Sequence, residues 1–302
     1  MAKIAGLFLM LLLVGAANTN TQAASAEQSF YKGKTIRIIV GFAAGGGFDA
    51  YARAIARNLS RHIPGNPAVI VDNMTGAGSR IAANYLYKAP PDGLIIGNFI
   101  GSLVLQQIMG DKSVEFDGRK FEWLGVPVQD ETVCGANDSD APRILKAALG
   151  LPIQLIEGFK GTSNIRIAAE AGEVDGGCWT WASIRTTWSK GLESGLVKPI
   201  IQINPKKAAD IPNVLIESGT HAPSAILRAY AVAPGTPKER INTLRTAFNA
   251  TMKDPEFVAE MDKSKLEINP LSGSEMESIV KKLFGMDAAN VAKIREVLVP
   301  KN

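Results

Sequence analysis

The sequence predicts an α/β fold in which a mostly parallel sheet is covered by helices on both faces. Short runs rich in β-branched residues alternate with longer runs whose apolar residues recur at helical spacing. Glycine-containing loops join the first strands to the helices that follow them. Repeated strand–loop–helix units of this length imply parallel pairing, because the chain must return over the face of the sheet between successive strands.

The alternation is clearest in the first third of the chain. Strands are expected at residues 35–42, 68–72 and 94–97, where β-branched residues are frequent. The helix expected at 49–62 keeps its apolar residues on one face, at Ala52, Ile55, Ala56, Leu59 and Ile63. A helix after the second strand does the same with Ile81, Ala82, Tyr85 and Leu86.

The rest of the chain continues with shorter strands and ends in capped helices. The expected strands are 132–136, 153–157, 197–203 and 227–232, and the expected helices are 141–149, 165–171 and 179–189. One helical face carries Trp181, Ile184 and Trp188, which are expected in the core. Capping signals predict three late helix starts: Thr236 before Pro237, Asp254 before Pro255, and Ser274 with Glu277 as a capping box.

Residues 1–26 have the pattern of a secretory signal peptide. Lys3 precedes an apolar run at 4–17, and a small-residue cleavage pattern ends at Ala26, ahead of Glu27. A membrane anchor is disfavoured because this run is shorter than the ~20 residues that a spanning helix needs. We therefore expect export to the periplasm, with cleavage near Ala26.

Composition excludes several function classes. The chain has 302 residues and a net charge of +4, and its basic residues are scattered, so no nucleic-acid partner is expected. With only two histidines, His62 and His221, imidazole catalysis is disfavoured, and no nucleophile stands beside a base. We expect no enzyme, no cofactor and no metal site. Cys134 and Cys178 could form a disulfide after export, or remain two buried thiols.

Two glycine loops carry the chemistry. The first, GFAAGGGFD at 41–49, and the second, NMTGAGS at 73–79, follow the first two expected strands, where open α/β sheets bind ligands. Glycine lets the backbone approach a ligand, and free amides at a helix start favour anions. Two such loops would form an anion cradle without a charged side chain. The alternative is a pair of tight turns, which the matched positions of the loops disfavour.

A second interpretation of the first loop is a dinucleotide fingerprint. Gly45-x-Gly47-x-x-Ala50 follows a strand and opens a helix, with Asp72 about 20 residues further on. This would make the chain a nucleotide-dependent oxidoreductase. Export, the lack of a proton donor in context and the unexplained second glycine loop disfavour that interpretation.

Several motifs in register resemble one family. They are YKGK at 31–34, FAAGGGFD, NMTGAGS, APPDG at 89–93, FKG at 159–161, GEVD at 172–175, IPNV at 211–214 with ESG at 217–219, and PGTP at 234–237. Together they resemble the periplasmic solute-binding receptors of tripartite tricarboxylate transporters, the Bug family. The resemblance implies a type II periplasmic binding protein. Such a protein has two lobes, each a mostly parallel sheet flanked by helices, joined by crossover strands and closing on a small organic acid.

The resemblance also implies which residues bind the ligand. In the family, backbone amides of both loops hold a carboxylate, partly through water. The matching positions are Phe42, Ala43, Ala44, Gly45, Gly46, Gly47, Asp49, Gly76, Ala77, Gly78 and Ser79, with Lys160 and Asp175 as candidates from the second lobe. Asp49 fits a helix N-cap better than a ligand contact, because an acid beside an anion is unfavourable. Lys160 is as compatible with a solvated loop, and Asp175 with a turn cap.

This chain departs from the family pattern in two respects. Phe48 and Met74 replace more polar positions, which predicts a less polar acid. The segment 136–141 is shorter than in the family, so either the second wall is reduced or stretches are missing.

The expected organisation is a signal peptide at 1–26, a first lobe of 27–131 plus 227–302, and a second lobe of 132–226. The expected function is a monomeric receptor that delivers a small carboxylate to membrane transporter subunits. An exported sensor feeding a signalling kinase is the alternative that shares the same binding chemistry.

Overall fold

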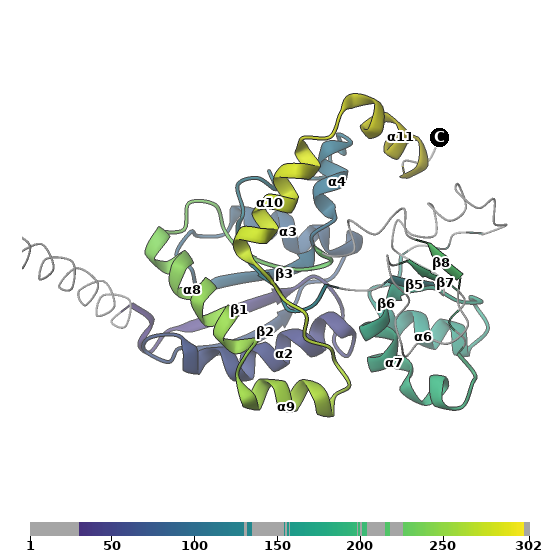
Figure 1. The fold of residues 1–302 in the computed structure, drawn as a ribbon, viewed down its shortest axis with the longest axis horizontal. Coiled ribbons are helices and arrows are strands. Elements are labelled where there is room, and N and C mark those ends of the chain that lie inside the picture. The colour runs from purple at the N-terminus through teal and green to yellow at the C-terminus, as the bar shows by residue number, and fades with distance from the viewer. Residues whose placement is uncertain are drawn as a thin grey trace, which may run out of the picture.

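The computed structural model describes residues 30–129, 132–134, 154, 156, 158–197, 199, 201–203, 215–217 and 226–298. These residues form two sheets, each with its own helices, and Figure 1 shows the larger sheet beside the smaller one along the long axis of the molecule. The α/β class expected from the sequence is confirmed. The division into lobes at 131 and 227 remains a prediction.

The larger sheet has six strands in the order β10-β4-β9-β3-β1-β2. Their bounds are β1 Thr35–Val40, β2 Ala68–Asn73, β3 Ile95–Ile100, β4 Glu122–Val126, β9 Arg228–Val232 and β10 Leu271–Ser272. β1 pairs in parallel with β2 and β3, as the strand–loop–helix pattern predicts. The three other pairings, β3·β9, β4·β9 and β4·β10, are antiparallel. The sheet is therefore mixed, and the expectation of a mostly parallel sheet is wrong, because the chain returns to it through β9 in the opposite direction.

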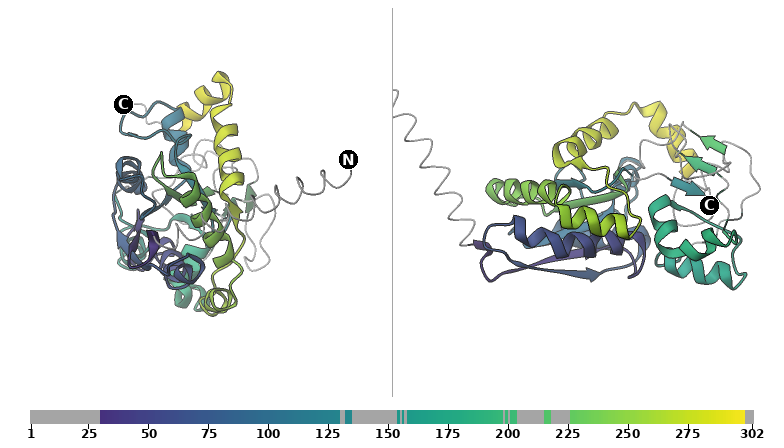
Figure 2. Two further views of the ribbon diagram at one scale, coloured as in Figure 1. Left: turned by 90° about the vertical axis from the view of Figure 1, so that its left-hand side faces the viewer. Right: turned by 60° about the horizontal axis from the view of Figure 1, so that its bottom comes forward.

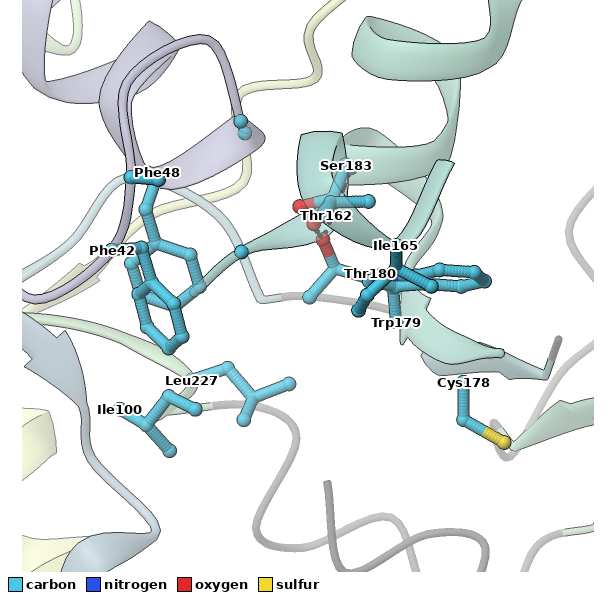
Figure 3. A pocket seen from close by; sticks show the side chains of 14 residues that line it. Phe42, Phe48, Ile100, Thr162, Ile165, Cys178, Trp179, Thr180, Ser183 and Leu227 are labelled. Atoms are coloured by element: carbon cyan, nitrogen blue, oxygen red, sulfur yellow. Dashed lines mark hydrogen bonds between the residues drawn. The ribbon is translucent and has the colours of Figure 1, made fainter. Parts of the chain in front are cut away.

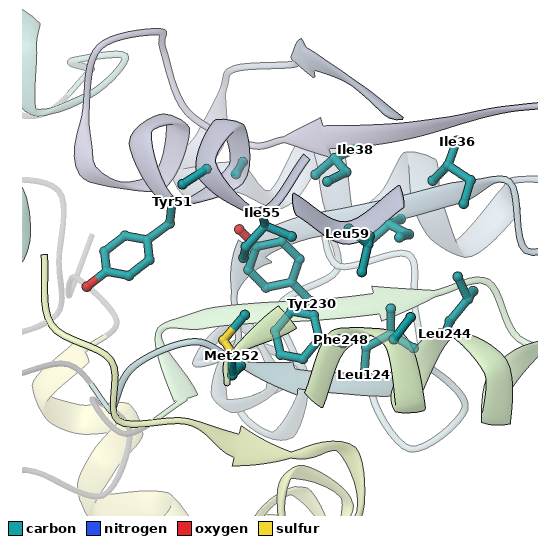
Figure 4. Packing of buried hydrophobic residues seen from close by; sticks show 14 of the residues in the cluster. Ile36, Ile38, Tyr51, Ile55, Leu59, Leu124, Tyr230, Leu244, Phe248 and Met252 are labelled. Atoms are coloured by element: carbon teal, nitrogen blue, oxygen red, sulfur yellow. The ribbon is translucent and has the colours of Figure 1, made fainter. Parts of the chain in front are cut away.

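Helices cover both faces of this sheet. They are α2 Gly47–Leu59, α3 Arg80–Lys88, α4 Leu103–Ile108, α8 Lys238–Thr251, α9 Pro255–Lys263 and α10 Gly273–Phe284. The last helix, α11 Ala288–Leu298, extends beyond α10. Alternate residues of β9 divide between two cores: Tyr230 and Val232 pack toward α2, α8 and α9, whereas Ala229 and Ala231 pack toward α3, α4 and α10. Figure 4 shows the first core, with Tyr230 beside Phe248, their ring centroids 5.3 Å apart.

The smaller sheet has the order β6-β5-β7-β8, with β5 Thr132–Cys134, β6 Cys178–Thr180, β7 Ile201–Ile203 and β8 Leu215–Glu217. β7 and β8 are parallel, and the other pairs are antiparallel. Its helices are α6 Thr162–Glu170 and α7 Trp181–Glu193. As expected, Trp181, Ile184 and Trp188 are buried together. The right-hand view of Figure 2 shows α6 and α7 beside the end of α2.

Of the three helix starts predicted in the last part of the chain, the structure confirms one. Asp254 is the N-cap of α9, as expected, and accepts hydrogen bonds from the amides of Glu256 and Phe257. The other two predicted starts are wrong. α8 has Pro237 at its N-cap, since the Thr236 hydroxyl donates to the Ala233 carbonyl instead. α10 uses Ser272 and Glu275 as its capping box, two residues before the predicted pair.

Some expectations fall outside the described residues. These include the signal peptide at 1–26, the helix at 141–149, the short segment at 136–141 and most of the strand at 153–157. Among the described helices, none combines the length and apolar character needed to cross a membrane.

Cys178 in β6 is disulfide-bonded. The one other cysteine of the sequence is Cys134, whose backbone lies opposite Cys178 in the antiparallel register of β5 and β6. Of the two alternatives left open by the spacing, the disulfide is therefore the one that the structure contains.

Reduction of this disulfide is expected to lower the free energy of unfolding by about 2–4 kcal/mol, because it releases a long loop in the unfolded chain. The measurement is thermal unfolding with and without a phosphine reductant. Cys178→Ser provides the control, since its melting temperature should not respond to the reductant. Equal melting temperatures for the reduced and oxidised wild type would contradict the expectation.

Candidate functional site

A pocket of about 630 Å³, including its open mouth, lies between the larger sheet's side of the molecule and α6 and α7. It is lined by Phe42, Ala43, Gly46, Gly47, Phe48, Ile100, Gly161, Thr162, Ile165, Cys178, Trp179, Thr180, Ser183 and Leu227. Figure 3 shows Phe42 and Phe48 on one side and Ile165 and Trp179 on the other. Both sheets therefore contribute residues to one pocket that is open at its mouth.

Three helix N-termini meet at this pocket. The N-cap residues Gly46 of α2, Gly161 of α6 and Thr180 of α7 all line it. First-turn amides have no partner inside a helix, and the helix dipole places partial positive charge at this end. Such an arrangement attracts an anion from three directions.

The start of α2 is the most open of the three. None of the described residues accepts a hydrogen bond from the amides of Gly46, Gly47 or Phe48. Gly47 also lies against the opposite wall, because a Cβ placed there would overlap Ser183 Oγ and lie 2.9 Å from Arg228 Nη2. Glycine at position 47 thus lets α2 approach α7 closely.

Asp49 does not cap α2, because the helix begins at Gly47 and Asp49 occupies its third position. Its buried carboxylate accepts hydrogen bonds from Arg53 Nε at 2.8 Å, the Gly45 amide at 2.9 Å and Asn73 Nδ2 at 3.0 Å. Burial by itself would raise the pKa of Asp49, but these three donors together hold that pKa below its ordinary value. The expected N-cap role is therefore wrong, and Asp49 instead orders the loop before the helix.

Asn73 extends this order to the second glycine loop. Its Nδ2 also donates to the Phe42 carbonyl at 2.8 Å, so that one side chain joins the two loops. The Gly45 amide, expected to face a ligand, is already bonded to Asp49.

Acidification is expected to weaken this network. Asp49 has a lowered pKa, so it stabilises the fold above the ordinary range for aspartate, near pH ~4, and that contribution is lost as pH falls through the folded pKa. The melting temperatures of wild type and Asp49→Asn should therefore converge between neutral pH and pH ~3. Asp175→Asn, at an exposed position, is the control. A constant gap between wild type and Asp49→Asn would show that the ionised carboxylate is not what orders the loop.

The second glycine loop contributes no residue to the described lining of the pocket. Ala77, Gly78 and Ser79 have successive positive φ values of 47°, 58° and 70°. Ser79 Oγ accepts a hydrogen bond from the Ile100 amide at 2.9 Å, which fixes the loop against β3. Gly76, Ala77, Gly78 and Ser79 are absent from the described lining of the pocket, so their role in binding remains a prediction.

The remaining predicted residues are dispersed. Of the first loop, Phe42, Ala43, Gly46 and Gly47 line the pocket, whereas Ala44 and Gly45 are exposed. The Ala43 amide donates to the Lys160 carbonyl at 3.1 Å, so Lys160 joins the two walls through its backbone while its residue is exposed. Asp175 is exposed and does not line the pocket.

Sequence analysis missed the charged group behind the pocket. Arg228, at the start of β9, is fully buried. Its guanidinium lies 4.7 Å from the ring centroids of both Phe48 and Tyr51. Nη2 donates to Thr180 Oγ1 and, at 3.0 Å, to Ser183 Oγ, which both line the pocket. The expectation of a site without a charged side chain therefore needs correction: a cation reaches the pocket through two hydroxyls.

The described residues contain no cluster of three or more His, Cys, Asp and Glu that could hold a metal. His62 lies at the far end of α2 and is bonded to Asp254 at 2.8 Å. Asp72, which the dinucleotide interpretation requires, forms an ion pair with Arg37 at 2.7 Å.

The chain is similar in sequence to curated UPF0065 proteins. No protein-family model matches the chain. It is 34% identical over 99 residues to a UPF0065 protein of Bordetella bronchiseptica, a match that covers 32% of this chain and only 28% of that relative. A longer match, 24% identical over 280 residues, covers 81% of this chain and 84% of a UPF0065 protein of Bordetella pertussis.

Solved structures share the whole architecture. The periplasmic binding protein BugD has a TM-score of 0.71 at 22% identity, covering 88% of this chain and 98% of its own. Two Rhodopseudomonas palustris proteins follow, one solved with adipate (TM-score 0.68, 18% identity, 88% and 97% coverage) and MatC with bound malate (0.66, 17%, 88% and 99%). The chain therefore has the two-lobed fold of the Bug and TctC periplasmic binding proteins, and the resemblance inferred from its sequence motifs is confirmed.

Proposed function

We propose that this chain is a periplasmic receptor of the Bug type that closes on a small organic carboxylate. The observation that carries the proposal is the convergence of three helix N-termini on one pocket lined by residues of both sheets. The open first-turn amides of α2 and the positive ends of the three helix dipoles can bind an oxyanion without a covalent step. The carboxylates named for the two R. palustris neighbours, adipate and malate, agree with this chemistry.

Buried charge adds to the attraction. The Arg228 guanidinium donates to the hydroxyls of Thr180 and Ser183, which both line the pocket, and so polarises them toward donating to an anion. No acidic side chain lines the described pocket, so an anion meets no like charge there.

We propose further that residues 1–26 direct export and are removed, and that the loaded receptor delivers its ligand to membrane subunits of a tripartite tricarboxylate-type transporter. The two lobes would be 27–131 plus 227–302 and 132–226, and the receptor would act as a monomer. Ligand-bound closure would be the state that the membrane subunits recognise. A sensor that feeds a signalling kinase would use the same pocket and differ in its partner.

A thermal-shift screen of the chain from Glu27 onward tests the binding function. The panel holds mono-, di- and tricarboxylates, acidic amino acids, aromatic acids and NAD. A carboxylate at 100 times its dissociation constant is expected to add ~2.7 kcal/mol of stability and raise the melting temperature by several degrees. Mass spectrometry of the denatured protein first identifies any ligand carried through purification. Stabilisation by NAD alone would overturn the proposal in favour of an oxidoreductase.

Loss of the gene distinguishes transport from signalling. Uptake of the acid found in the screen should cease in a deletion strain if the receptor feeds a transporter. Unchanged uptake with a lost transcriptional response to that acid would favour the sensor.

A further inference from the structure

The pocket is apolar apart from its helix N-termini. Away from them its walls are formed by Phe42 and Phe48, whose ring centroids are 4.4 Å apart, by Ile165 and Trp179 opposite, and by Ile100 and Leu227. In Figure 3 Phe42, Phe48, Ile100 and Leu227 lie on one side of the pocket, and Ile165 and Trp179 lie with Thr180 and Ser183 on the other. A ligand that fills the pocket therefore meets hydrocarbon over most of its surface.

The described lining offers no cation to a second negative charge. It contains no Lys, Arg or His, and its hydroxyl side chains, Thr162, Thr180 and Ser183, all lie at the starts of α6 and α7. The indole Nε1 of Trp179 is a further donor, but it is neutral and buried. A carboxylate placed between the aromatic and aliphatic side chains would lose its hydration without gaining a charged partner. Burial of an unpaired charge is strongly unfavourable.

The hydroxyl of Ser183 is restricted to a donor role by its neighbours. Thr180 Oγ1 accepts from Arg228 Nη2 and from the Ser183 amide at 3.1 Å, so its own proton goes to Ser183 Oγ at 2.9 Å. Ser183 Oγ accepts that proton and a second one from Arg228 Nη2. With both lone pairs engaged, Ser183 can only donate, and none of the described residues accepts its proton.

We infer that the ligand is a carboxylate with a single charged head and an apolar body. The head lies between the amides that open α2 and the Ser183 hydroxyl, whose donor role is fixed by Arg228. The body lies between Phe42 and Phe48 on one side and Ile165 and Trp179 on the other. This inference rests on the proposed function and narrows its substrate class.

Matched probes test the inference on the wild-type protein from Glu27 onward. Hexanoate and adipate share a six-carbon chain and differ by the second carboxylate, and hexan-1-ol lacks the charge. Isothermal titration is expected to give an affinity for hexanoate about 10- to 100-fold higher than for adipate, and no measurable binding of the alcohol.

The outcomes distinguish the inference of a single charged head from the proposal of an anion site. Adipate binding as tightly as hexanoate, or more tightly, would overturn the single-head inference and leave carboxylate capture intact. The alcohol binding as tightly as hexanoate would overturn the proposed anion site itself.

Two variants examine the ends of the ligand separately. Ser183→Ala should weaken hexanoate binding about tenfold or more, because it removes a donor to a charged group. Thr187→Ala is the matched control on the same helix, since its hydroxyl is bonded to the Ser183 carbonyl at 2.8 Å and does not line the pocket. An equal effect of both variants would contradict the role of Ser183.

Leu227→Lys places a cation in the apolar part of the pocket. It should raise the affinity for adipate relative to hexanoate by about tenfold or more, because the second carboxylate gains a partner. An unchanged ratio in a variant whose ligand-free melting temperature matches the wild type would contradict the placement of the apolar body.

Discussion

Gly47→Ala is expected to weaken carboxylate binding by about 10- to 100-fold while the protein remains folded. A Cβ at this position would overlap Ser183 Oγ and lie 2.9 Å from Arg228 Nη2. The overlap with Ser183 is between α2 and α7, so parting the two walls relieves it, whereas the contact with Arg228 requires a shift of the guanidinium on the same wall. The ligand-free protein should lose no stability from the helix itself, because Ala is favoured over Gly in a helix by about 1 kcal/mol. Isothermal titration with the acid identified by the screen measures the loss.

Gly46→Ala is the matched control at the preceding position. The nearest atom to a Cβ there is the Ala43 carbonyl oxygen at 3.7 Å, an ordinary contact. This variant should bind within a few-fold of wild type. If both variants bound equally well, close approach of α2 and α7 would not be part of binding.

Trp123→Ala is expected to lower the free energy of unfolding by about 3–5 kcal/mol. Trp123 in β4 is almost completely buried, contacts Phe99 and Phe121 with ring centroids 5.8 and 5.4 Å away, and donates from Nε1 to the Gly118 carbonyl at 3.1 Å. Truncation leaves both a cavity and an unpaired carbonyl. Urea denaturation followed by far-ultraviolet circular dichroism gives the difference.

Ile70→Ala provides the comparison, since Ile70 on the edge strand β2 is 44% exposed. Its truncation should change stability by about 0.5 kcal/mol or less. A loss of unfolding free energy below ~1 kcal/mol for Trp123→Ala would mean that the core around Phe99 and Phe121 does not depend on the Trp123 side chain of β4.

The strongly periodic segments could be predicted from the sequence. β1, β2, α2 and α6 lie within a few residues of their expected places, because the apolar spacing that signals each element is also what buries it. By contrast, β4 was not predicted. Its five residues, EWLGV, acquire strand structure by pairing with β9, more than a hundred residues away along the chain. Local pattern carries no information about such a partner.

In the candidate site, too, features that depend on local sequence could be predicted and those that depend on distant residues could not. The open amides at the start of α2 follow from glycines and a helix that sequence reasoning can place. Arg228 could not be identified in this way, because its burial depends on the rings of Phe48 and Tyr51 and on the hydroxyls of Thr180 and Ser183 at the start of α7. The one signal in the sequence is that Arg228, a charged residue, lies near the start of a strand expected at 227–232.

In the second glycine loop, a sequence pattern that predicts ligand binding also has a role in packing. Its glycine pattern predicts a ligand contact, but Gly41, Ser79 and Ile100 show that it also serves the packing between β1, β3 and α3.

The hydrogen bond from the Ala43 amide to the Lys160 carbonyl has a kinetic consequence. It joins the two walls of the pocket without a ligand, and a typical backbone bond contributes about 1 kcal/mol. The pocket has an open mouth, so a small solute can enter without breaking this bond, whereas any wider parting of the walls requires the bond to break. For a solute too large for that mouth, the association rate would reach a plateau at high solute concentration, set by the frequency with which the walls part.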